Sequence, residues 1–414
     1  MTAETSAAQH LPPLIAEHDT WISVDPVTGC PADCAYCYLG PLGLRATRPV
    51  PRITPRRTAE EVHKFLHGRR AELIDPLEDP TPLCLGNYTD MLMTPENRRA
   101  TVETLREISR TIRPRTTILI TKSILREETV AEIDELEWPV VWFFSQSFAR
   151  NAGIPLERGR ISHFEDTLAN ARLISASKNQ QAVHFWRPFV QELTPAPADM
   201  PFWVASLKNS GMRCSVLTGL RLGPGVPDDD PRLHTHLPDS MRAGLRTTQM
   251  FDQESWKEAT RAGRHVGYPV YRNSSCALAL VSEAREQLGT WNPAVFADRC
   301  TPCFCPADQR RRCLPIRPPN HEEGHNPTEL CERLGRFLKI NSDRISINEV
   351  KKYLYIEAAV SEFDYNTIMH AMRGRYVPVV QSTEWRRAWK SAWSTEARRR
   401  AGDDPTAPFR SVMP

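Results

Sequence analysis

Short apolar runs alternate with longer amphipathic stretches along the first half of the chain. The runs are nearly continuously apolar, as in strands buried on both faces, and they lie at 21–24, 82–85, 117–120, 140–144, 182–186 and 213–217. The stretches between them place apolar residues at helical spacing, at 97–113, 127–136, 164–177 and 198–210. A further helix is expected to open at Thr58 with capping-box spacing, because Glu61 follows three residues later. The alternation predicts an α/β fold with a parallel sheet.

The pattern changes after residue 225. A loop leads to a helix at 250–264, five cysteines fall between 276 and 313, and a polar, proline-rich linker extends to residue 330. The remainder predicts a small α/β appendage, in which one helix begins at Ser346 and another spans 383–400. The expected organisation is a lead-in over 1–18, a main unit over 19–225, a cysteine-rich extension over 226–330, the appendage over 331–400 and a tail over 401–414.

Composition narrows the class of protein. The 414 residues are 40% hydrophobic and 25% charged, which suits a globular protein, and the net charge of +3 neither predicts nor excludes nucleic-acid binding. The first 16 residues lack the basic and apolar segments of a signal peptide, and no apolar run is long enough to span a membrane. We therefore expect a cytoplasmic protein with no membrane partner. Eleven cysteines in such a chain indicate metal or redox chemistry rather than disulfides.

Three of these cysteines, Cys30, Cys34 and Cys37, directly follow the first predicted strand in the order C-x3-C-x2-C. Thiolates are ligands of soft metal ions and of iron–sulfur clusters. Three thiolates on a cube of four irons leave one iron open to a small molecule. The alternative is a structural zinc knuckle, but zinc sites pair cysteines and close with a fourth ligand, which the neighbouring sequence lacks.

The motif resembles that of the radical S-adenosylmethionine (radical SAM) superfamily, in which an aromatic residue such as Tyr36 also precedes the third cysteine. The resemblance implies a partial (β/α)6 TIM-like barrel and a 4Fe-4S cluster at Cys30, Cys34 and Cys37. It implies further that the open iron binds the amine and carboxylate of S-adenosyl-L-methionine (SAM), whose cleavage gives a 5′-deoxyadenosyl radical. Residues 20–225 are similar to the spore photoproduct lyase-like branch, through this motif, Thr121-Lys122-Ser123 and a strand-end arginine.

The resemblance directs attention to the strand ends, where α/β barrels carry their chemistry. Gly86 and Asn87 stand where the family usually has a Gly-Gly-Glu-like stretch, and their carbonyls could accept the SAM ammonium beside Asp90; alternatively, Thr89 and Asp90 cap the next helix. Further candidates for binding SAM are Tyr36, Lys122, Ser145, Ser147, Glu157, Arg187 and Gly219.

The expected roles of these later candidates differ. Lys122 could pair with the SAM carboxylate or a substrate anion, or lie on the surface. Ser145 and Ser147 could meet the ribose or carboxylate, and the resemblance implies that Glu157 could meet the ribose hydroxyls. Arg187 needs an anion, which is either the SAM carboxylate or a neighbouring acidic side chain. Gly219 would let the backbone approach the adenine closely.

A second group of cysteines predicts another metal centre. Cys276, Cys300, Cys303 and Cys313 are the expected ligands of a second 4Fe-4S cluster, which leaves Cys305 spare. The compact alternative uses Cys300, Cys303, Cys305 and Cys313, so that Cys276 is free. The spare thiol, Cys276 or Cys305, is a candidate hydrogen-atom donor to a substrate radical. A structural zinc is the other interpretation.

The expected function is hydrogen abstraction from a small polar substrate, such as a sugar, aminoglycoside or nucleoside in natural-product biosynthesis. Alternatives are a nucleic-acid repair lyase of the spore photoproduct lyase type, a peptide-modifying enzyme and a non-catalytic iron–sulfur protein. A flavodoxin or ferredoxin would donate the electron. Basic residues and tryptophans share a face of the last predicted helix, which we expect to dock on the core rather than bind nucleic acid.

Overall fold

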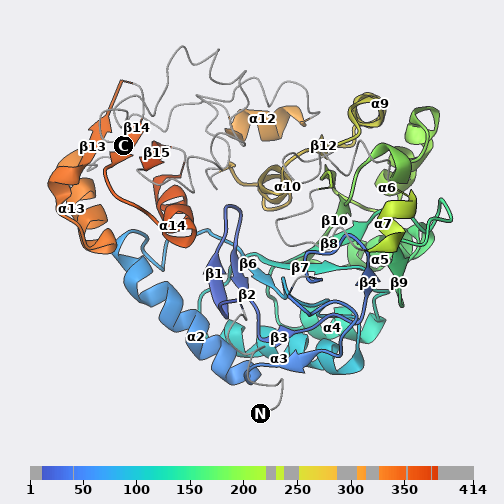
Figure 1. Cartoon of the computed structure of the whole chain (residues 1–414), viewed down its shortest axis with the longest axis horizontal. Coiled ribbons are helices and arrows are strands. Elements are labelled where there is room, and N and C mark those ends of the chain that lie inside the picture. Colours follow the sequence, from blue (N-terminus) through green and yellow to red (C-terminus); the bar gives the residue numbers. More distant parts are fainter. Residues whose placement is uncertain are drawn as a thin grey trace.

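The computed structural model describes residues 12–40, 42–220, 230–236, 251–286, 305–313, 326–350, 353–373 and 375–380. One eight-stranded sheet organises them, with the strand order β1-β2-β6-β7-β8-β10-β11-β12 (Figure 1). The strands are β1 (Ile15–Glu17), β2 (Ile22–Val24), β6 (Leu83–Leu85), β7 (Thr117–Thr121), β8 (Val140–Gln146), β10 (Gln180–Trp186), β11 (Ser215–Leu217) and β12 (Val270–Tyr271). All neighbours pair in parallel except β1, which pairs antiparallel with β2.

The sheet confirms the predicted α/β class and extends it. All six predicted strands are present in the predicted order, and β12 adds a seventh parallel strand that the sequence pattern did not indicate. The edges of the sheet are β1 and β12, and no pairing between them closes a barrel in the part of the chain that the structure describes.

Helices cover one face of the sheet (Figure 1). They are α2 (Pro55–His67), α3 (Pro95–Thr111), α4 (Glu127–Asp134), α5 (Phe164–Ser175), α6 (Met200–Asn209) and α9 (Gln253–Val266). The first of these begins earlier than expected, because Thr54 caps it by accepting a hydrogen bond from the Arg57 amide and Pro55 occupies its first turn. The capping box expected at Thr58 is therefore wrong.

Alternation along each strand sorts side chains between the two faces. Trp142 and Phe144 of β8 pack toward the helices, whereas Phe143 packs on the opposite face with Phe185 of β10. Helix α10 (Ser274–Val281) covers part of that second face. Because both faces are buried, the strands are continuously apolar, as the sequence showed.

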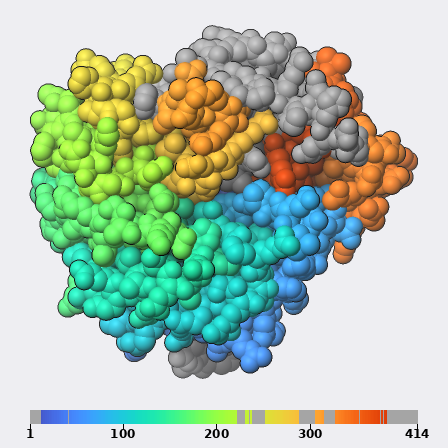
Figure 2. Space-filling model, turned by 180° about the vertical axis from the view of Figure 1, so that it is seen from behind, coloured from blue at the N-terminus to red at the C-terminus, as the bar shows by residue number. Residues whose placement is uncertain are grey.

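A small unit follows the main sheet in the sequence. It contains α13 (Pro327–Leu338), β13 (Ile345–Asn348), β14 (Tyr353–Ile356), α14 (Glu362–Met372) and β15 (Val377–Val380), with the strand order β13-β14-β15. The helix expected at Ser346 is wrong, because residues 345–348 pair with β14 instead. The unit packs its own apolar core against Leu73 and Ile74, beside the N-terminal part of the chain (Figure 2).

Shorter elements complete the described chain. They are β3 (Val27–Thr28) with β5 (Val50–Pro51), β4 (Asp33–Cys34) with β9 (Glu157–Arg158), α7 (Pro231–His236), α12 (Ala307–Cys313), and the 3-10 turns η2 (Arg69–Glu72), η3 (Gln191–Leu193), η4 (Pro197–Asp199) and η6 (Ser342–Arg344). The helix predicted at 383–400, residues 314–325 of the linker predicted over 314–330, and the tail lie outside the described residues. The linker ends earlier than expected, because α13 begins at Pro327. Among those described, none of the helices has the length and apolar character that a membrane crossing requires.

Candidate functional site: a cavity lined by three thiols

A cavity of about 360 Å³ opens where the parallel strands end. Most of the residues predicted for the site line it: Cys30, Cys34, Tyr36, Cys37, Gly86, Asn87, Asp90, Lys122, Ser145, Arg187 and Gly219. These residues lie far apart in sequence and meet here because parallel strands all end at one edge of the sheet. Of the predicted set, Ser147 and Glu157 lie just behind this lining, in contact with Tyr36.

The loop that carries the three cysteines is held by backbone hydrogen bonds. Gly29 enters it at a φ of +90°, and a side chain there would stand 2.8 Å from the Arg48 carbonyl. The Cys30 amide donates to the Leu44 carbonyl at 2.8 Å, and Cys34 pairs with Glu157 through the β4–β9 ladder. The loop is thus a fixed scaffold for the thiols.

Asp33 of this loop belongs to a network of four charged side chains that holds the loop in place. Asp33 contacts Arg45 at 3.4 Å and Arg232 at 2.8 Å, while Asp230 contacts the same two arginines at 3.0 and 2.7 Å. Arg45 also donates to the Ala35 carbonyl at 3.0 Å. The arrangement fastens α7, which comes some 200 residues later in the chain, to the cysteine loop.

The thiols themselves are in a desolvated setting. Cys30 and Cys34 are 9% and 4% exposed, and burial raises the pKa of Cys30 to about 12. Burial also raises the pKa of Cys37, against the opposing effect of Arg187 and Lys122. The thiols are therefore protonated without a metal, and a bound metal centre would displace their protons.

The donor set fits an iron–sulfur cube better than a zinc ion. A zinc ion needs four ligands within about 2.3 Å, which places its sulfurs about 3.8 Å apart. Three thiols line the cavity, and the described part of the chain shows no group of three or more His, Cys, Asp or Glu side chains placed to hold a single metal ion. A cube presents separate irons to separate thiolates, so three thiols spread around one cavity suit it.

The Asp90 carboxylate is used inside the protein. It accepts hydrogen bonds from the Thr121 hydroxyl at 2.9 Å, from the Lys122 amide at 2.8 Å and from the Leu92 amide at 2.9 Å. It therefore ties the loop after β6 to the end of β7. The alternative that Asp90 or Thr89 caps the next helix is wrong, because Thr94 caps α3.

Lys122 is likewise already paired. Its Nζ lies 2.8 Å from Glu157 Oε1 and 3.4 Å from the Ser145 carbonyl, and Tyr36 donates a hydrogen bond to Glu157 as well. Burial acts to raise the pKa of Glu157, but Lys122 outweighs it and holds that pKa below its usual range. Lys122 is therefore a buried, paired residue and not a surface lysine, and its expected contact with SAM or a substrate anion stays a prediction.

In the cavity lining, the Arg187 guanidinium lies beside two aromatic rings. Its guanidinium carbon lies 5.9 Å from the centre of the Tyr38 ring and 5.7 Å from that of Phe185. Within the described residues no carboxylate forms an ion pair with it. The expected alternative of a salt bridge to a neighbouring acidic side chain therefore fails there, and an anion entering the cavity would find this arginine available.

Sequence reasoning missed several lining residues: Trp21, Tyr38, Met93 and Thr218. Tyr38 directly follows the last cysteine, is 42% exposed, and donates a hydrogen bond to the Asn87 carbonyl. Its place in the motif was the available signal. Trp21 gave none, because its position at the start of β2 only becomes part of the site through the packing of the sheet.

The second cysteine group is only partly described. Cys300 and Cys303 lie outside the described residues. Cys276 and Cys305 pack against the apolar face beneath α10, where Tyr271 donates to Cys305 Sγ at 3.3 Å. Gln309 donates to Cys313 Sγ at 3.3 Å. Neither set of expected ligands is therefore tested, and the second cluster stays a prediction.

Comparison with known proteins gives distant likenesses alone. No family model matches the chain, and neither does any curated protein. Among solved structures, it is similar to a spore photoproduct lyase mutant with bound AdoMet and dinucleoside spore photoproduct, at 15% identity and a TM-score of 0.44, over 59% of this chain and 72% of that one. It is also similar to a second mutant of that lyase, with dinucleoside spore photoproduct, at 15% identity and a TM-score of 0.43. That match covers 58% of this chain and 70% of the other.

Proposed function

We propose that this chain is a radical SAM enzyme. The observation that carries the proposal is the convergence of Cys30, Cys34 and Cys37 on one cavity at the strand ends, beside an arginine with no acidic partner among the described residues. A 4Fe-4S cluster held by these thiols would supply one electron to the sulfonium of SAM, giving methionine and a 5′-deoxyadenosyl radical. That radical would take a hydrogen atom from the substrate.

The residues of the chain have separate parts in this reaction. Arg187 binds the SAM carboxylate, because it is the available cation in the lining. The carbonyls of Gly86 and Asn87 accept the SAM ammonium. Lys122 and Glu157 neutralise one another and fix Tyr36 behind the cluster loop. A low-potential electron donor such as a flavodoxin or ferredoxin would deliver the electron from outside.

The size of the cavity constrains the substrate. Small-molecule pockets measure about 300–1,000 Å³, so a cavity of 360 Å³ that the cluster and SAM share leaves little room for a further ligand. The substrate would then meet the radical at the mouth of the cavity. Tyr38, which is 42% exposed, supplies a ring on which a nucleobase could stack. This lining favours a nucleobase-containing substrate, as for a nucleic-acid lyase, over a free sugar or aminoglycoside.

The test is formation of 5′-deoxyadenosine by protein reconstituted with iron and sulfide, in the presence of SAM and dithionite. Cys34→Ala should abolish the product, whereas Cys331→Ala, in the C-terminal core, should leave it unchanged. The proposal fails if wild-type protein carrying a cluster makes no 5′-deoxyadenosine, or if Cys34→Ala makes as much. Deuterium transfer into 5′-deoxyadenosine from labelled dinucleotides, but not from labelled sugars, would support the substrate class.

A further inference from the structure

Asp25 is a buried acidic residue directly after β2 that does not line the cavity. Its Oδ1 accepts a hydrogen bond from the Tyr88 amide at 3.2 Å, and Arg52 donates to its main-chain carbonyl at 3.3 Å. Its Oδ2 is buried and has no hydrogen-bond partner in the described part of the chain. Burial raises the pKa of this carboxyl to about 7, against the opposing effect of the Asn87 and Tyr88 amides.

The carboxyl holds the loop that faces SAM in the proposed function. This loop, residues 86–90, is joined to the end of β2 and to the entry of the cysteine loop by two backbone hydrogen bonds, Gly86 N to the Val24 carbonyl at 3.0 Å and Gly29 N to the Tyr88 carbonyl at 3.1 Å. The Thr89 hydroxyl also donates to the Gly29 carbonyl at 2.5 Å. The Asp25 side chain strengthens the same junction between the two loops by accepting the hydrogen bond from the Tyr88 amide. It lies behind the peptides whose other face lines the cavity.

A purely structural role would not need a carboxylate here. An asparagine oxygen could accept the Tyr88 hydrogen bond without the cost of burying an ionisable group. A buried carboxyl with one oxygen that lacks a hydrogen-bond partner lowers stability, which is explained if its charge stabilises a bound ligand. The ligand of the proposed function carries a positive charge on its ammonium group, which would meet the carbonyls of Gly86 and Asn87, and Asp25 holds the amide of the next residue, Tyr88.

We propose that Asp25 is a positioning residue that orients the Gly86–Asn87 carbonyls toward the SAM ammonium and supplies the counter-charge behind them. The inference rests on the proposed function and adds a residue to it. Asp25 acts through the main chain and does not itself touch SAM. Its ionised form is stabilised when the ammonium arrives, and the same coupling tightens the binding of SAM.

The test compares SAM with an analogue that lacks the α-amino group, using equilibrium dialysis on cluster-loaded protein. Asp25→Asn should weaken SAM binding about tenfold, as expected for loss of one charge-assisted contact, and leave the analogue within about twofold. The KM for SAM should rise with the Kd while kcat changes less than about threefold, since the chemical step is untouched. Iron content should match the wild type.

Asp252→Asn is the matched control. Asp252 is a buried aspartate that caps α9 by accepting from the Ser255 amide at 2.9 Å, away from the cavity. Its replacement should change neither dissociation constant. If Asp25→Asn does not fold, Asp25→Ser retains a hydrogen-bond acceptor without the charge and takes its place.

Two results would overturn the inference: an unchanged Kd for SAM in the Asp25 variant, or an equal loss for SAM and for the amine-free analogue, which would indicate general damage to the loop. Failure of the proposed function looks different. Wild-type protein that binds SAM but makes no 5′-deoxyadenosine removes the enzymatic proposal, while the two dissociation constants still decide the role of Asp25. Wild-type protein that binds neither compound overturns both.

Discussion

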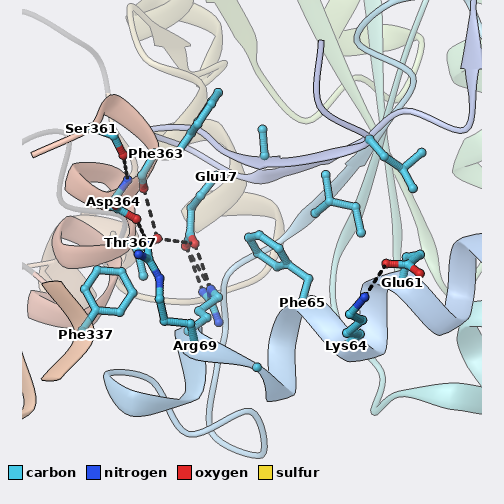
Figure 3. A pocket seen from close by; sticks show the side chains of 15 residues that line it. Glu17, Glu61, Lys64, Phe65, Arg69, Phe337, Ser361, Phe363, Asp364 and Thr367 are labelled. Atoms are coloured by element: carbon cyan, nitrogen blue, oxygen red, sulfur yellow. Dashed lines mark hydrogen bonds and ion pairs between the residues drawn. The ribbon is translucent and has the colours of Figure 1, made fainter. Parts of the chain in front are cut away.

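Glu17 should be one of the most sensitive positions for stability in the chain. It ends β1 and is 1% exposed, at the edge of a cavity of about 720 Å³ between β1, α2 and α14 (Figure 3). Arg70 donates to both of its carboxylate oxygens at 3.0–3.1 Å, Thr367 donates at 2.8 Å, and His370 Nδ1 lies 2.5 Å away. The carboxylate thus joins the main sheet to the C-terminal unit.

The cost of replacing Glu17 by Gln follows in two ways. Burial alone would raise the pKa of Glu17, but Arg70 and His370 outweigh it and lower that pKa from 4.5 to about 2. Lowering the pKa of Glu17 from 4.5 to about 2 corresponds to about 3 kcal/mol of stability at neutral pH. Removing one partner of a buried ion pair typically costs about 3–5 kcal/mol. Both routes give a loss of about 3 kcal/mol in the free energy of unfolding.

The dependence on pH has a definite sign. Because the folded-state pKa lies below the unfolded value, the stabilisation is fully present above pH 4.5 and is lost as the pH falls through about 2. Glutamine does not titrate. The difference between wild type and Glu17→Gln should therefore be largest at neutral pH and shrink as the pH falls below 4.5.

Urea unfolding at pH 7 and at pH 3.5, with hydrogen exchange of the α14 amides, measures this loss. The control is Asp364→Asn, which breaks the half-exposed ion pair with Arg69 at the rim of the same cavity and should cost less than about 1 kcal/mol. The reasoning is refuted if Glu17→Gln costs no more than this control. The same pairing explains why we assign no ligand to this cavity: its buried charges satisfy one another.

Three further predictions concern the sheet and the site. His184 is fully buried and burial lowers its pKa to about 3, so stability should fall as the pH drops from 6.5 toward 3. In His184→Gln the Tm should fall less over this pH range than in the wild type, and an equal fall would contradict this. Gly86→Ala should cost at least about 1–3 kcal/mol in urea unfolding, because Gly86 has a φ of +81° and a Cβ there would stand 2.2 Å from Met91; a loss below about 0.5 kcal/mol would refute it. Lys122→Met should cost about 3 kcal/mol by leaving Glu157 buried alone, and adding Glu157→Gln should restore most of it; additive losses in this double-mutant cycle would show that the pair is not coupled.

Local patterns predicted most of the secondary structure, and the errors have identifiable causes. Helix α2 begins before the capping-box spacing at Thr58 predicts, because Thr54 caps it and a proline in the first turn marks a helix start more strongly. The segment from Ser346 to Asn348 was assigned to a helix, but pairing with β14 makes it a strand. Short segments of mixed propensity are decided by a distant partner that periodicity does not reveal.

Most of the strand-end residues named from the sequence line one cavity, but the pairing of their charges could not be predicted. Strand-end position alone brought Asp90, Lys122 and Arg187 to one cavity, because neighbouring parallel strands end at a common edge. Which of these carries an available charge could not be read from the sequence. Lys122 is neutralised by Glu157 of β9, and the Asp90 carboxylate accepts three hydrogen bonds from uncharged donors, whereas Arg187 is flanked by rings.

By itself, the sequence determined the α/β alternation, the three-thiol loop and the strand ends from which a site would be built, because apolar periodicity and cysteine spacing are properties of short segments. Only the tertiary structure decided that Lys122 is paired, that no carboxylate among the described residues pairs with Arg187, and that Asp25 contacts the loop that lines the cavity. These features depend on how close two side chains come and how deeply they are buried, and the partners lie 30 to 60 residues or more apart in the chain. No short segment of the sequence therefore reveals them.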